Sequence, residues 1–345
     1  MPLLSLQLPP DYDEYPPSTV AGTIISPDES SMTPQEPAAT FTASSPVASN
    51  GHKVGLLPQK GSFRRNFNFI RRVMVPQMFS LRTNTPLRPD LLSHDTGEFQ
   101  VTWIGHASFL VQTEGMNLLI DPVWSRWLGL LKRVRNPGIE IEDLPPIHAV
   151  LITHAHFDHL HLRALKRIGC GQPIVVPRGV GVLVRGRGFG EIIEMDLWAK
   201  IKLGPLEITF TPSKHWGARM VHDVHRGFGG FLIRNESGRT VYHCGDSAYF
   251  EGFARIGNEA DIDLAMMPIG AYEAMSGRDV HLNPEEALTA FADIRAKHMV
   301  PMHYGTFPLG GEPMDEPLRR LITASEDRNL KKAVTVMHEG KPLKF

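Results

Sequence analysis

The sequence is poor in cysteine and has no long hydrophobic run. Cys170 and Cys244 are the two cysteines of 345 residues, which excludes a disulfide framework and fits a reducing compartment. No apolar run approaches the roughly 18 residues that span a bilayer, and the N-terminus lacks the basic start and apolar core of a secretory signal. We therefore expect an intracellular protein, either cytoplasmic or peripherally attached to a membrane.

The sequence also lacks an excess of charge of either sign. Lys and Arg total 36 against 37 for Asp and Glu, so the bulk charge gives no reason to expect a nucleic-acid partner. Hydrophobic residues make up 42% of the chain, enough for a substantial core in one large α/β domain or two smaller ones. Composition thus indicates an ordinary globular protein.

Three regions differ in composition. Residues 1–52 are rich in Pro, Ser and Thr without periodicity, which predicts a disordered tail. Residues 53–98 form a basic arm in which cations alternate with phenylalanines, and such a segment can contact an anionic membrane or a phosphorylated ligand. The alternative is a solvated arm that wraps the domain and buries its phenylalanines. Residues 99–345 are expected to form the folded domain. The arm's cations and aromatics up to Arg88 are Lys53, Lys60, Arg64, Arg65, Arg71, Arg72, Arg82, Arg88, Phe63, Phe67, Phe69 and Phe79.

Short apolar segments bounded by turn residues predict many strands with intervening helices from residue 99 onward. Two sheets packed face to face with helices outside would satisfy this order, as would an open α/β sheet. The expected strands are 99–105, 108–122 with a turn at 114–115, 148–154, 173–177, 192–196, 206–213, 230–234, 240–246, 264–270 and 333–339. The expected helices are 160–168, 180–185, 283–296 and 316–327.

The stretch LITHAHFDHLHL at residues 151–162 concentrates metal-binding side chains directly after a buried strand. Alternation along the extended chain sends His154 and His156 to one side, where they can chelate one ion, while a turn lets Asp158 and His159 reach a second. Imidazole and carboxylate suit Zn²⁺, although Fe or Mn could also be held. The alternative is a surface histidine cluster or core histidines satisfied by carbonyls, which this spacing disfavours.

Later strand ends supply the further ligands that two metals require. His215 follows one strand, Asp246 a second and His303 a third. Gly245 and Gly305 beside them would permit the close turns that let backbone approach an ion. A carboxylate such as Asp246 can bridge two cations, whereas an imidazole cannot.

The H-x-H-x-D-H motif, followed in order by His215, Asp246 and His303, resembles the metallo-β-lactamase superfamily over residues 99–310. The resemblance implies an α/β fold, the four-layer αβ/βα sandwich, with a binuclear site along one edge. It implies that His154, His156 and His215 bind one metal, that Asp158, His159 and His303 bind the other, and that Asp246 bridges them.

A narrower resemblance rests on the segments WIGHASFLVQ, LLIDPVWS, KHWGAR, GDSAYF, PIGAYE, HLNPEEAL and MHYGTF. Together they are similar to the N-acylphosphatidylethanolamine-hydrolysing phospholipase D family and its bacterial relatives. This implies two Zn²⁺ per chain and cleavage of a membrane phosphodiester into an N-acylethanolamine and phosphatidic acid. By the same resemblance His281 would lie near the substrate phosphate.

The expected chemistry is direct attack of a metal-bound hydroxide on phosphorus. We expect Asp158, Asp246 and His281 to be catalytic. Asp246 would accept a hydrogen bond from the nucleophile, and His281 would stabilise the phosphate or protonate the leaving group. The alternative for His281 is a structural histidine packed near a helix N-cap.

Three further residues are expected behind or beside the metals. His106 and Asp121 would support metal-bound imidazoles, which usually donate their free N–H to a carboxylate or carbonyl. Asp121 could equally be a turn residue before Pro122. Tyr272 would line the pocket, with a packed tyrosine as the alternative.

Other functions stay open on the sequence alone. The same metals would serve a phosphorylated-lactone hydrolase or another soluble phosphodiesterase, and the same superfamily contains iron-binding oxidoreductases. A non-catalytic module would be expected to lose ligands, yet all seven candidates are present. The expected partner is a phospholipid or another phosphodiester substrate, with peripheral membrane contact and a homodimer left open.

Overall fold

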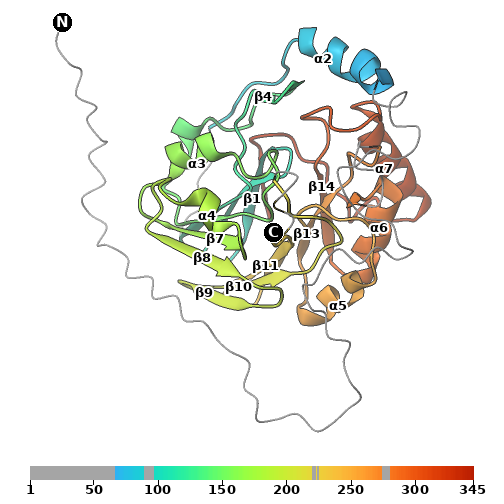
Figure 1. Ribbon diagram of the computed structural model, residues 1–345. Coiled ribbons are helices and arrows are strands. Elements are labelled where there is room, and N and C mark those ends of the chain that lie inside the picture. The colour runs from blue at the N-terminus through green and yellow to red at the C-terminus, as the bar shows by residue number, and fades with distance from the viewer. Residues whose placement is uncertain (1–66, 89–96, 220–222, 224, 274–279) are drawn as a thin grey trace, which may run out of the picture.

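The computed structural model describes residues 67–88, 97–219, 223, 225–273 and 280–345. Two β-sheets lie against each other within these residues, and helices cover the outer side of each (Figure 1). The first sheet has the strand order β15 (Pro342–Lys344), β1 (Gln100–Gly105), β2 (Ser108–Thr113), β3 (Met116–Ile120), β6 (Ala149–Leu151), β7 (Pro173–Pro177) and β8 (Glu191–Met195).

The second sheet has the order β14 (His298–Met302), β13 (Leu264–Pro268), β12 (Thr240–His243), β11 (Gly230–Arg234), β10 (Leu206–Thr211) and β9 (Lys200–Leu203). A separate ribbon pairs β4 (Trp127–Leu128) with β5 (Leu131–Lys132). The helices are a π-helical turn η3 (Ile70–Met74), α2 (Val75–Phe79), a 3₁₀ turn η4 (Ile141–Asp143), α3 (Leu162–Ile168), α4 (Gly181–Val184), α5 (Gly252–Glu259), α6 (Pro284–Asp293) and α7 (Glu316–Asp327).

Period-two alternation in the strands of the first sheet creates two apolar layers. On β2, Phe109 and Val111 join the core between the sheets, where they cluster with Phe231 of β11. Leu110 points to the opposite side and packs in a second cluster with Leu165 of α3. Because successive strand side chains face opposite ways, one continuous apolar strand serves both layers.

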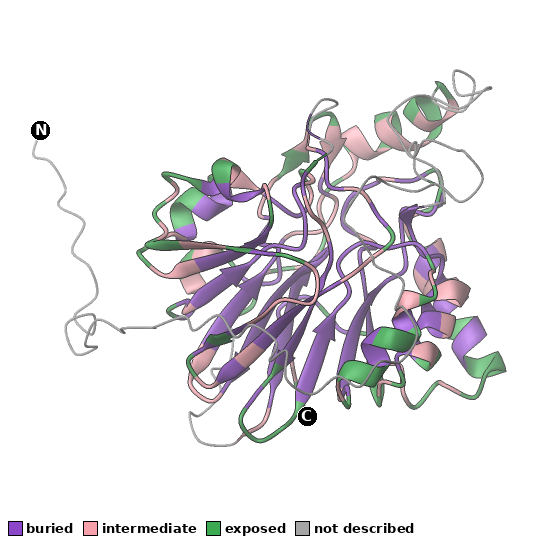
Figure 2. Cartoon of the chain, turned by 60° about the horizontal axis from the view of Figure 1, so that its bottom comes forward, coloured by how far each residue is buried: buried purple, intermediate pink, exposed green. Residues whose placement is uncertain are grey.

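The outer side of the second sheet is covered by α5, α6 and α7. Phe253, Leu288 and Leu321 from these helices are buried in the same core as the sheet residues. In Figure 2 the strands are almost wholly buried, and the helices turn exposed residues outward. The four-layer αβ/βα sandwich is therefore confirmed, and the open-sheet alternative is wrong.

The carboxyl ends of several strands meet at one edge because part of each sheet is parallel. β6 runs parallel to β3 and β7, and β13 runs parallel to β12 and β14. The segments that follow β6, β12 and β14 carry the H-x-H-x-D-H motif, Asp246 and His303. Ligands far apart in sequence are thereby brought together.

The expected last strand at 333–339 is wrong. Only Val334 in that segment forms a bridge, to Met299 at the edge strand β14. The alternating valines resemble a strand, but Met337 turns into the core instead of continuing the pairing. The terminal strand is β15, which pairs antiparallel with β1 and begins at Pro342, where an edge strand tolerates proline. Strand β9 and the β4–β5 ribbon were not expected either, since two to four residues give little periodicity.

The described part of the basic arm, residues 67–88, packs its helix α2 against β5. Phe67 and Phe79 are exposed, so the expectation that the arm buries its phenylalanines is wrong for these two. The tail 1–52 and the arm up to residue 66 lie outside the described residues, and the domain boundaries stay predictions. Within the described ranges no helix has the length and apolar character needed to cross a membrane.

Candidate metal centre

The loop after β6 turns sharply at the expected motif. The carbonyl of His156 accepts hydrogen bonds from the backbone N–H groups of His159 and Leu160, at 3.2 and 2.8 Å. This turn directs His154 and His156 to one side and Asp158 and His159 to the other. His154 and His156 thus belong to one group of potential ligands, and Asp158 and His159 to another.

A first group of potential ligands gathers around His156. Its Nδ1 lies 3.0 Å from Nε2 of His154 and 3.2 Å from Nε2 of His215. Asp246 Oδ2 lies 3.8 Å from both His154 Nε2 and His215 Nε2. The four ligand atoms are within 4.8 Å of one another, so all can reach a single cation.

A second group gathers around Asp158. Its Oδ2 lies 3.0 Å from Nε2 of His106, 3.4 Å from Nε2 of His303 and 3.7 Å from Nε2 of His159. The sequence predicts His106 behind the candidate ligands, whereas the structure puts its ring nitrogen among the atoms of this group.

Asp246 belongs to both groups. The same oxygen that faces the first group lies 3.0 Å from His303 Nε2 and 3.2 Å from His159 Nε2. It also lies 3.9 Å from Nδ1 of His281, and Asp246, His281 and His303 form a third potential ligand set. One buried carboxylate thus stands between two histidine clusters.

Several polar atoms at this centre make no hydrogen bond among the described residues. They include His156 Nε2, His281 Nδ1 and Asp246 Oδ1. A buried polar atom without a partner costs about 1–3 kcal/mol, so a concentration of them calls for a ligand. Imidazole nitrogens with carboxylate oxygens are the donor set of zinc and related cations. The residues therefore fit bound divalent metal.

Burial sets the charge of the first group. It lowers the pKa of His154 and His215 well below the ordinary value, and it lowers the pKa of His156 to about 4. These imidazoles are neutral at pH 7, which is the form that binds metal. Burial also lowers the pKa of His303, but Asp246 and Asp158 outweigh it and raise that pKa to about 9.

Asp121 supports the His159 ring on the side away from Asp246. Its Oδ2 accepts hydrogen bonds from His159 Nδ1 at 2.7 Å and from the Thr153 hydroxyl at 2.6 Å, and its Oδ1 accepts the Thr153 N–H at 2.8 Å. Its backbone has a φ of 44°, a left-handed conformation that costs energy for a non-glycine residue. Asp121 thus both supports His159 and turns the chain before Pro122.

His281 and Tyr272 have different surroundings. The ring of His281 lies 5.1 Å from the His215 ring and 5.4 Å from the His303 ring, so it borders the centre. The Tyr272 hydroxyl instead donates to Glu316 Oε1 at 2.8 Å, and the ring lies under the guanidinium of Arg320. The structure therefore brings Tyr272 to α7 and not to the histidines, as the packed-tyrosine alternative requires.

Sequence reasoning missed Thr153 and Arg219. The Thr153 hydroxyl lies 3.0 Å from His154 Nδ1 and links that ring to Asp121. Arg219 Nη1 donates to the carbonyls of Ala155 and Leu160, at 2.8 and 2.9 Å, and so ties both sides of the ligand loop together. The available signals were the position of Thr153 beside His154 and of Arg219 in the segment KHWGAR, and neither identifies a role.

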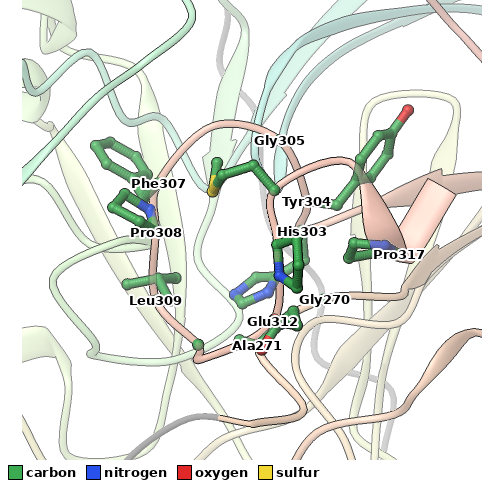
Figure 3. Close-up of a pocket in the computed structure, with 13 residues that line it drawn as sticks. Gly270, Ala271, His303, Tyr304, Gly305, Phe307, Pro308, Leu309, Glu312 and Pro317 are labelled. Carbon is green, nitrogen blue, oxygen red and sulfur yellow. The ribbon is translucent and has the colours of Figure 1, made fainter. Parts of the chain in front are cut away.

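A small cavity lies beside His303 (Figure 3). Its volume is about 10 Å³, room for about one water molecule. The carboxylate of Glu312 closes one wall by accepting the N–H groups of Ala271 and Glu273, at 2.6 and 3.2 Å. The cavity is too small for a phospholipid headgroup.

Known proteins are similar to this chain over about 70% of its length. The sequence profile of the Beta-lactamase superfamily domain matches residues 116–304. The N-acyl-phosphatidylethanolamine-hydrolyzing phospholipase D 1 of Caenorhabditis elegans is 33% identical over 270 residues, which cover 70% of this chain and 75% of that protein. A UPF0173 metal-dependent hydrolase of Pyrobaculum arsenaticum is 36% identical over 250 residues, covering 71% of this chain and 100% of that protein.

A solved structure adds evidence on the fold. Igni18, a metallo hydrolase from Ignicoccus hospitalis, superposes with a TM-score of 0.55 at 27% identity. The superposition covers 72% of this chain and 98% of that one.

Proposed function

The chain belongs to the beta-lactamase superfamily and is a metal-dependent hydrolase, and we propose that it is a binuclear zinc phosphodiesterase of the phospholipase D type. The proposed substrate is N-acylphosphatidylethanolamine, and the products are an N-acylethanolamine and phosphatidic acid.

The position of Asp246 carries the proposal of two metals. Its Oδ2 lies between 3.0 and 3.9 Å from ring nitrogens of both histidine groups. A carboxylate shared in this way suits two cations better than one. The proposed ligands are His154, His156 and His215 for one metal, Asp158, His159 and His303 for the other, and Asp246 for both. His106 is proposed to hold Asp158 in place through their 3.0 Å contact.

Two divalent cations bound here would lower the pKa of a water molecule and draw charge from a phosphoryl oxygen. The chain's own groups orient the reaction. Asp246 Oδ1 has no hydrogen-bond partner among the described residues. It is proposed to accept a hydrogen bond from the attacking water. Asp158, which contacts His106, is proposed to hold the second metal in position.

His281 is proposed to bind the substrate phosphate. Its Nδ1 is buried, faces Asp246 at 3.9 Å and has no hydrogen-bond partner in the described part of the chain. An imidazole placed in this way can hydrogen-bond a phosphoryl oxygen as charge develops there, which typically contributes 10²–10³-fold to the rate.

The lipid substrate is supported by the similarity to the Caenorhabditis elegans phospholipase D. The test is hydrolysis of N-acylphosphatidylethanolamine beside bis(p-nitrophenyl) phosphate on one zinc-loaded preparation. We expect both to be cleaved, with phosphatidic acid released from the lipid. Cleavage of the generic diester alone would keep the metal chemistry and discard the lipid, and a phosphorylated lactone would then be the next substrate to assay.

The His281→Asn variant tests phosphate binding by His281 separately from metal binding. We expect this variant to keep its zinc and to lose about 10²–10³-fold in kcat. Unchanged turnover would leave His281 as a packed residue near the α6 cap.

A further inference from the structure

A cleft of about 500 Å³ lies between the basic arm and the β4–β5 ribbon, apart from the metal centre. In Figure 1 the labels α2 and β4 mark this region at the top of the molecule. The lining contains three cations and no acid. The lining residues are Ser80, Leu81, Arg82, Arg126, Trp127, Lys132 and Asn136.

Reciprocal hydrogen bonds build the cleft. Thr83 N–H donates to the carbonyl of Val134 at 3.0 Å, and Asn136 N–H donates to the carbonyl of Thr83 at 3.1 Å. The side-chain amides of Asn84 and Asn136 each donate to the other residue's carbonyl at 3.0 Å. The two walls are therefore fixed relative to each other before any ligand arrives.

The cations of the cleft are not neutralised by acids. Lys132 Nζ donates to the carbonyls of Met78 and Ser80 and lies 6.0 Å from the centre of the Trp127 ring. No ion pair to a described residue involves Arg82 or Arg126. The neighbouring Arg133 adds a fourth positive charge, which is fully buried and bound by the carbonyls of Val123 and Ser125.

Large apolar side chains surround these cations at the surface. Phe79 is 82% exposed, Leu81 is 88% exposed and Leu130 is 65% exposed, and Trp127 is exposed beside them. Scattered apolar residues are normal on a protein surface, but a group around a cationic cleft indicates a partner that is itself amphiphilic. Neither a purely polar anion nor an apolar peptide would use both features.

We propose that this cleft binds the phosphate headgroup of an anionic lipid while Phe79, Leu81, Trp127 and Leu130 enter the bilayer interface. The chemistry is that of interfacial proteins, in which cations meet lipid phosphates and aromatic or aliphatic side chains sit at the headgroup boundary. The cleft is tied to the metal centre, because Val134 N–H donates to the Thr306 carbonyl and the Thr306 hydroxyl accepts the N–H of His106. Docking there would fix one side of the centre relative to the membrane.

The test is vesicle co-sedimentation of the full chain, which measures adsorption and needs no hydrolysis. Vesicles of phosphatidylcholine alone are compared with vesicles of phosphatidylcholine mixed with phosphatidylserine. We expect binding only to the anionic vesicles, weakened by salt. Each cation near the surface contributes about fivefold in affinity, so Arg82→Gln with Arg126→Gln should lower binding roughly 25-fold. Leu81→Ser should lower binding while leaving net charge unchanged.

The charge-matched control is Arg185→Gln with Lys202→Gln, which removes two exposed cations from the region of α4 and from β9. Equal loss of vesicle binding in the control and the cleft variant would reduce the effect to net charge and overturn the inference. Binding of inorganic phosphate to the cleft without any vesicle binding would also overturn it, as would loss of self-association in the cleft variant without vesicle binding. Hydrolysis of bis(p-nitrophenyl) phosphate should be the same in both variants, so failure here leaves the proposed function intact.

Discussion

Asp246 and His303, from the ends of two strands separated by β13, meet with Oδ2 and Nε2 at 3.0 Å. His303 reaches this position in a left-handed backbone conformation, with φ at 61°. Its N–H donates to the carbonyl of His106, which is itself left-handed at φ 58°. Strained backbone at such residues is retained where geometry matters for function.

Replacing Asp246 by Asn should remove the charge shared by both ligand groups. We expect the variant to bind less metal and to lose at least about 100-fold in hydrolysis, because charge stabilisation of the reacting group is lost. Elemental analysis and turnover of bis(p-nitrophenyl) phosphate measure the two effects. Asp196→Asn, which alters an exposed carboxylate paired with Arg178, is the matched control and should change neither. Full metal content in Asp246→Asn would contradict a bridging role.

Asp121→Asn should weaken the support of His159. Residues that hold a metal-bound imidazole from behind typically contribute 10–100-fold to metal affinity or activity, and we expect a loss of that order. Competition with a zinc chelator measures it. Thr153→Val keeps the carboxylate and removes one of its donors, so its effect should be smaller. Equal affinity of wild type and Asp121→Asn would make Asp121 a turn residue only.

Arg219→Ala should loosen the ligand loop. Two hydrogen bonds to the carbonyls of Ala155 and Leu160 are lost, as is the contact with the Phe157 ring at 4.1 Å. Hydrogen bonds to a charged group contribute about 1.5–3 kcal/mol, and we expect a loss of that order in the free energy of unfolding together with faster zinc release. Arg163→Ala, on an exposed position of α3, is the control. A change in stability without faster zinc release would limit Arg219 to a structural role.

The metal-free protein should lose stability as pH falls from about 6.5 toward 4. Burial lowers the pKa of His156 and of His281 from 6.5 to about 4, so in this window the unfolded chain binds protons that the folded chain does not. Each such proton lowers the free energy of unfolding by about 1.4 kcal/mol per pH unit. His303 has the opposite sign. Its pKa is raised to about 9, so its contribution is complete below 6.5 and is lost as pH rises through 9.

Urea unfolding of chelator-treated protein across this pH range measures the effect. His156→Asn should flatten the acid limb, because one of the titrating groups is gone. Stability that stays constant between pH 6.5 and 4 in the metal-free protein would contradict the burial of neutral imidazoles.

The meeting of the candidate ligands at one edge was predictable because they follow strand ends, and strands with strong apolar runs are easy to locate. His154, His215, Asp246 and His303 all occupy such positions. The fold was predictable from resemblance, whereas composition and periodicity alone left two architectures open. The α6 start was also predictable, since Pro284 suits the first helical turn and Glu285 and Glu286 suit the positive end of the helix dipole. The structure adds a capping box between Asn283 and Glu286.

Other features depend on contacts that no local pattern encodes. The approach of His106 to Asp158 requires the pairing of His303 N–H with the His106 carbonyl, 197 residues apart by number and joined only in the fold. The role of Arg219 depends on where the carbonyls of a separate loop point. The cationic cleft forms only because hydrogen bonds join the arm to the segment after the β4–β5 ribbon. The two-residue strands of that ribbon are too short to give a periodic pattern in the sequence.

The most direct test of the account is the number and identity of metals per chain in protein reconstituted with zinc and freed of excess. Elemental analysis of wild type should give two zinc per chain, as the proposed bridging by Asp246 implies. One metal per chain, or a preference for iron over zinc in competition, would contradict the binuclear zinc centre.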